Sequence, residues 1–124
     1  MKKDKPRDIR ERTFEFSVMV LKLVKLISKN QINTTLINQI IRSSTSIGAN
    51  VEEAVGAHTK TDFSYSMNIA KKEARETFYW LKLIKEENPS LLEKLEHLLK
   101  ENEELIKILT TIVKKYNPRI FLKQ

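Results

Sequence analysis

The 124-residue chain contains no cysteine, only two glycines and three prolines. Without cysteine it cannot form a disulfide, a thiolate metal site or a cysteine nucleophile. So few glycines and prolines leave it short of the turn residues that a multi-stranded sheet requires. Its longest apolar stretch, 18–27, is interrupted by Lys22 and Lys25 and is shorter than the ~20 residues of a membrane span. These absences argue against a disulfide-bonded module, a sheet protein and a membrane-spanning protein.

The basic N-terminus is followed by neither an uninterrupted apolar core nor a small-residue cleavage site, so it does not resemble a signal peptide. Hydrophobic residues make up 40% of the chain and charged residues 31%, a balance typical of a soluble globular domain and too apolar for disorder. We therefore expect one domain spanning 1–124, located in the cytoplasm, with no membrane partner.

Apolar residues recur at helical spacing in four successive segments, which predicts four amphipathic helices. Short polar breaks separate the segments, so consecutive helices should run antiparallel. We predict an all-α, up-down-up-down four-helix bundle with a basic arm at 1–7 and a short tail at 117–124. The predicted helices cover about 8–29, 34–55, 61–87 and 90–116.

Polar residues at the breaks predict where the helices begin. Asn33 or Thr34 is expected to cap the second helix by accepting a hydrogen bond from a free backbone N–H. Ser90 and Glu93 have the spacing of a capping box at the start of the fourth helix. Asn102 interrupts the leucine seam of that helix, where we expect it at the rim; a buried, register-setting position is the alternative.

The first segment is apolar on more than one side. Phe16, Val20 and Leu23 form one face, and Phe14 and Leu21 widen it well beyond a narrow stripe. A helix of this kind must be covered on more than one side, which its own bundle cannot do. We therefore expect further copies of the chain to cover it, together with the exposed aromatics Tyr79 and Trp80, in a closed homo-oligomer.

No catalytic constellation is found. His58 and His97 lack the glutamate three residues before them that bundle metal sites use, and both are expected on the surface. The chain has no glycine-rich phosphate loop, calcium loop or metalloprotease helix. We predict no catalytic residues, no metal and no cofactor, and therefore not an enzyme.

A polar line runs along the second segment beside its apolar face, and two glutamates of the third segment can meet it across a helix interface. We interpret the set as a hydrogen-bonded structural network, since buried polar groups must be satisfied whether or not they act. A ligand or cation site is the alternative. The set comprises Arg42, Ser46, Asn50, Glu53, Glu73 and Glu76.

Three motifs carry a family resemblance: SIGANVEEA at 46–54, TKTDF at 59–63 and IAKKEARETFYWLKLI at 69–84. They resemble the bacterial four-helix-bundle proteins encoded in intervening sequences of large-subunit ribosomal RNA genes. The resemblance implies a homopentameric barrel with a central channel and no catalytic residue. The accessory protein of diversity-generating retroelements, which is similar in fold, binds a reverse transcriptase and nucleic acid through a basic surface. Ser66 stands where the family pattern has lysine.

The formal net charge of +7 is uneven: 1–50 holds ten basic residues against four acidic ones, and the last residues are basic again. The two ends of an antiparallel bundle lie together, so we predict one basic patch that binds RNA or DNA phosphates, or a nucleic-acid-processing protein. With only Tyr116 and Phe121 beside it, strong base stacking is not expected. A purely structural homo-oligomer is the alternative. The patch comprises Lys2, Lys3, Lys5, Arg7, Arg10, Arg12, Lys114, Lys115, Arg119 and Lys123.

Overall fold

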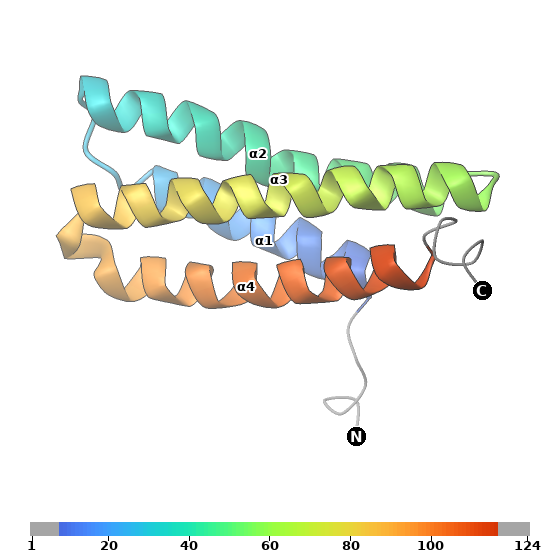
Figure 1. Cartoon of the computed structure of the whole chain (residues 1–124). Helices are drawn as coiled ribbons and strands as arrows, with labels where there is room; N and C mark the ends of the chain where they lie inside the picture. Colours follow the sequence, from blue (N-terminus) through green and yellow to red (C-terminus); the bar gives the residue numbers. More distant parts are fainter. Residues whose placement is uncertain (1–7, 117–124) are drawn as a thin grey trace.

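A computed structural model describes residues 8–116, which form four long helices and one short 3-10 helix (Figure 1). Each long helix runs antiparallel to the next, and α1 also packs against α4, which closes the bundle. The predicted all-α four-helix bundle is confirmed. Within this part of the chain, no helix is long and apolar enough to cross a membrane. The elements are α1 (Ile9–Val24), α2 (Gln31–Val55), α3 (Lys60–Glu87), η2 (Pro89–Leu91) and α4 (Leu92–Lys115).

The side chain that caps α2 is not the one expected from the sequence. Asn30 accepts the hydrogen bond from the Asn33 backbone N–H at 2.8 Å, so α2 begins one turn before Thr34. The prediction of Asn33 or Thr34 as the cap was wrong. Asn33 lies inside the helix and is buried, where its side chain exchanges hydrogen bonds with Asn88 at the end of α3. This amide pair joins the start of α2 to the end of α3.

The predicted capping box at the start of α4 was also wrong. Pro89 begins the short helix η2, and its missing N–H is harmless there because the first helical N–H groups have no intrahelical partner. Ser90 therefore lies within η2 and does not cap α4. The first residue of α4 is Leu92, and no side-chain hydrogen bond caps the helix.

The core lies between the four helices and takes fully buried side chains from each of them. Phe16 of α1 and Ile47 of α2 have no exposed surface, nor do Leu81 of α3 and Leu105 of α4. Burying one such side chain contributes about 1.5–3 kcal/mol relative to leaving it in water. Asn102 also lies in this core with no exposed surface, so the expected rim position was wrong. Its side-chain amide donates to a backbone carbonyl of α3 at 3.0 Å.

Candidate functional site

The polar line predicted along α2 is only partly joined to α3. Arg42 forms ion pairs with Glu73 at 3.2 Å and with Glu76 at 2.6 Å, and these connect the two helices. The hydrogen bond to Glu76 is the largest cause of the raised pKa of Arg42. The Arg42 side chain is half exposed, so water screens both pairs, and their contribution to stability is small.

The remaining members of the polar line do not join these ion pairs. The side-chain amide of Asn50 donates to the backbone carbonyl of Ser46 at 2.8 Å, a contact within α2 itself. Glu53 is exposed and forms no ion pair with any residue of 8–116. The structure therefore brings Arg42, Glu73 and Glu76 together, but not Asn50 and Glu53.

The basic patch can be followed for its four members within the described chain. The start of α1 and the end of α4 lie at the same end of the bundle, as the topology requires (Figure 1). Lys114 and Lys115 are exposed there, whereas Arg10 pairs with Asp8 at 3.2 Å and Arg12 with a glutamate of α4. Six predicted members lie outside the described residues: Lys2, Lys3, Lys5, Arg7, Arg119 and Lys123.

Arg12 has a structural partner that the sequence did not suggest. Its guanidinium binds both carboxylate oxygens of Glu101, with nitrogen–oxygen distances of 2.8 and 3.1 Å, and this joins α1 to α4. The two side chains are only 18% and 19% exposed. The hydrogen bonds to Glu101 raise the pKa of Arg12. The guanidinium is thus already bound and is poorly placed to contact a phosphate.

No described residues form an obvious metal or catalytic centre. His58 and His97 are both exposed, as expected from the sequence. Within 8–116 there is no group of three or more histidine, aspartate or glutamate side chains that could hold a metal ion.

A shallow groove between α1 and α2 leaves apolar side chains of α1 in water. Phe14 is 69% exposed and Leu21 37% exposed, with Val18 between them on the same helix. The groove has a volume of about 400 Å³, and the small residues Gly48 and Ala49 of α2 line its other side. This is the second apolar face of α1 that the sequence predicted, and the bundle does not cover it.

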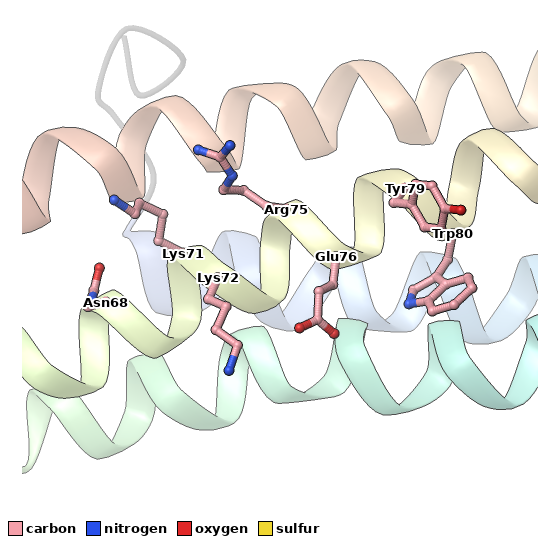
Figure 2. Close-up of a pocket in the computed structure, with 7 residues that line it drawn as sticks. All are labelled: Asn68, Lys71, Lys72, Arg75, Glu76, Tyr79 and Trp80. Carbon is pink, nitrogen blue, oxygen red and sulfur yellow. The ribbon is translucent and has the colours of Figure 1, made fainter.

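The outward face of α3 contains a hollow that the sequence reasoning did not single out as a site. Its volume is about 530 Å³, and cationic and aromatic side chains line it together. The signal was present in the motif at 69–84, whose aromatic pair, Tyr79 and Trp80, the sequence assigned to contacts between copies of the chain. Figure 2 shows the lining residues, which are Asn68, Lys71, Lys72, Arg75, Glu76, Tyr79 and Trp80.

Comparison with known proteins agrees with this fold. A sequence model of the family described as 23S rRNA-intervening sequence protein matches residues 5–111. The chain is also similar to a crystal structure of a protein of unknown function from the S23 ribosomal protein family of Bacteroides thetaiotaomicron. The two share 37% sequence identity and a TM-score of 0.79, over 86% of this chain and 99% of that chain. No protein with a curated description matches. The resemblance inferred from the sequence is confirmed, and the chain belongs to the 23S rRNA-intervening sequence protein family.

Proposed function

We propose that the protein is a non-enzymatic scaffold that assembles with copies of itself and binds nucleic acid, with RNA as the favoured partner, through a basic surface in the cytoplasm. The observation that carries the assembly is the exposed apolar face of α1 in the α1/α2 groove. Phe14 is 69% exposed there, and burying a side chain of this size contributes about 1.5–3 kcal/mol. A second copy seated on the groove would cover Phe14, Val18 and Leu21 together.

Two facts favour nucleic acid as the ligand of the assembly. The chain has a net charge of +7, and multiplying that charge in an oligomer strengthens attraction to a polyanion. The family description also names the intervening sequences of 23S rRNA, the gene segments that encode such proteins, so RNA is the first polyanion to test. A nucleic-acid-processing protein is the other partner that the basic surface would fit. The family resemblance implies five copies in the assembly.

Light scattering coupled to gel filtration tests the assembly. The chain has a mass of 14.6 kDa, so a pentamer has five times that mass. Phe14→Glu, which places a charge in the groove, should shift the protein to smaller species. Tyr65→Glu is the matched control, because Tyr65 is 68% exposed but lies outside the groove. A wild-type protein that elutes as a monomer would refute self-association.

Filter binding with unrelated RNA and DNA oligonucleotides tests the ligand. Neutralising several phosphates releases condensed counterions, so the affinity should fall log-linearly as the salt concentration rises. Absence of any complex at micromolar protein and low salt would contradict nucleic-acid binding. In that case the exposed apolar groove still supports the alternative, a purely structural homo-oligomer.

A further inference from the structure

We propose that the outward face of α3 is a binding surface for single-stranded nucleic acid, on which Lys71, Lys72 and Arg75 hold phosphates and Tyr79 stacks against a base. This inference rests on the proposed function and deepens it by locating the contact surface on the folded bundle. It also adds base stacking, which the sequence argued against.

Little of the net positive charge belongs to the helices of the bundle. Residues 1–7 carry four basic residues and one acidic residue, and 117–124 carry two basic residues and no acidic one. Most of the excess positive charge therefore belongs to these two end segments. The four helices are nearly balanced in charge, so they attract a polyanion only where cations are segregated from carboxylates.

Arg75 differs from the other arginines of the described chain in having no acidic partner. Arg10, Arg12 and Arg42 each bind a carboxylate at 3.2 Å or less. Arg75 is exposed and forms no ion pair with any residue of 8–116. An arginine offers a planar set of donors that matches phosphate geometry, and here that set is unoccupied.

Two lysines beside Arg75 also lack an acidic partner. Lys71 and Lys72 form no ion pair within the described helices. The carboxylate that lines the same hollow, Glu76, is already held by Arg42 at 2.6 Å. The hollow therefore presents three cations without an ion-pair partner in the described helices against one carboxylate that shares Arg42 with Glu73, and this excess of positive charge favours an anionic ligand.

The side chains form two lines along α3, as Figure 2 shows. Lys71, Arg75 and Tyr79 follow one another at steps of four residues and point to the same side of the helix. Each step advances about 6 Å along the helix axis. Cations in the first two turns and an aromatic ring in the third give a chain of nucleotides both phosphate and base contacts along one helix.

The aromatic part of the surface favours single strands over duplexes. Tyr79 is 53% exposed, and its ring is held edge-to-face against Trp80 with the ring centroids 5.2 Å apart. An exposed ring held in this way can stack with an unpaired base of any identity, because every base has a π-face. A duplex keeps its bases stacked on one another and offers Tyr79 no such face.

Trp80 provides a direct reporter of binding, because it is the single tryptophan of the chain and lines the hollow. Titration of the full-length protein with a uridine dodecamer should quench its emission to saturation. The matching duplex with an adenosine dodecamer should quench it less. Quenching by the duplex at equal or lower concentration would overturn the preference for single strands.

Charge variants test the cations against a matched control. Lys71→Ala with Arg75→Ala should weaken dodecamer binding and reduce the slope of log affinity against log salt by about 1.4, since each lost phosphate contact on a single strand removes about 0.7. Lys100→Ala with Lys107→Ala removes the same charge from exposed lysines of α4 outside this hollow, and should change the slope less. Equal effects of the two pairs would overturn the inference and leave general nucleic-acid binding intact.

Substitutions at Tyr79 test the stacking. Tyr79→Ala should weaken binding about 5-fold or more, whereas Tyr79→Phe should retain it, because stacking requires the ring and not the hydroxyl. Circular dichroism and light scattering on each variant check that fold and assembly persist. If the Lys71/Arg75 or Tyr79 variants instead change the mass of the oligomer, α3 is a subunit contact and the inference fails. If the wild type binds no oligonucleotide in the filter assay, it is the proposed function that fails.

Discussion

The ion pair between Arg12 and Glu101 makes a sharp prediction, because the sequence assigned Arg12 to a nucleic-acid surface and the structure gives it a different partner. Arg12→Met removes the charge but keeps a long side chain along α1. We expect the substitution to lower the free energy of unfolding and to leave the salt dependence of nucleic-acid binding unchanged.

The magnitude follows from the burial of the pair. Two charge-assisted hydrogen bonds join the groups, and about four-fifths of each side chain is buried. Breaking a fully buried pair costs about 3–5 kcal/mol, and an exposed pair contributes about 1 kcal/mol at most. We therefore expect a loss of about 1.5–3 kcal/mol. For a chain of this size this corresponds to a fall in Tm of about 5–15 °C.

Urea unfolding followed by circular dichroism measures this loss, with all variants at one protein concentration because assembly makes stability concentration-dependent. Glu101→Gln, alone and combined with Arg12→Met, completes a double-mutant cycle. The combined variant should lose less than the sum of the two single losses. An unchanged midpoint for Arg12→Met, or strict additivity, would refute the assignment of Arg12 to a structural ion pair. A weaker salt dependence of nucleic-acid binding in Arg12→Met would indicate instead that Arg12 contacts a phosphate.

Three further predictions follow from single residues. Gly48→Ala should raise the free energy of unfolding by up to about 1 kcal/mol, because glycine lowers helix stability relative to alanine. The added Cβ would lie 3.5 Å from the Thr13 side chain, which is an ordinary van der Waals contact. A lower melting temperature of the variant would show that the site is too tight for a methyl group. Asn50→Ala should cost less than about 1 kcal/mol, because its amide only bonds back to its own helix; a larger loss of melting temperature would indicate a contact across helices. The hydrogen bond from the Arg10 backbone N–H lowers the pKa of Asp8 below its ordinary 3.8, so this cap stabilises the start of α1 above that pH and is lost as the pH falls through the lowered value. The Arg10 amide should therefore lose hydrogen-exchange protection in acid, and Asp8→Asn should flatten that pH dependence.

Several features of the site depended on partners that no local pattern reveals. Arg12 and Glu101 lie 89 residues apart, and Asn33 and Asn88 lie 55 apart. Their pairing follows from the rotation of each helix about its axis and from the height at which neighbouring helices meet. The rotation of α4 about its own axis likewise places Asn102 in the core. The sequence pattern of a polar residue within a leucine seam is the same whether that residue is buried or lies at the rim.

The sequence by itself determined the number of helices, their antiparallel order and the apolar second face of α1. Apolar periodicity and the stop at Asn88 and Pro89 are local properties, and the burial of an apolar stripe is strong enough to decide helix formation wherever the partner helix lies. Only the tertiary structure decided which cations are neutralised and which remain free. Arg75 lies between two glutamates in the sequence and Arg42 has none nearby, yet Arg42 meets two carboxylates across the α2/α3 interface and Arg75 faces outward without an ion pair within 8–116. An ion pair between two helices forms only where their side chains come within about 4 Å, and that distance is set by packing.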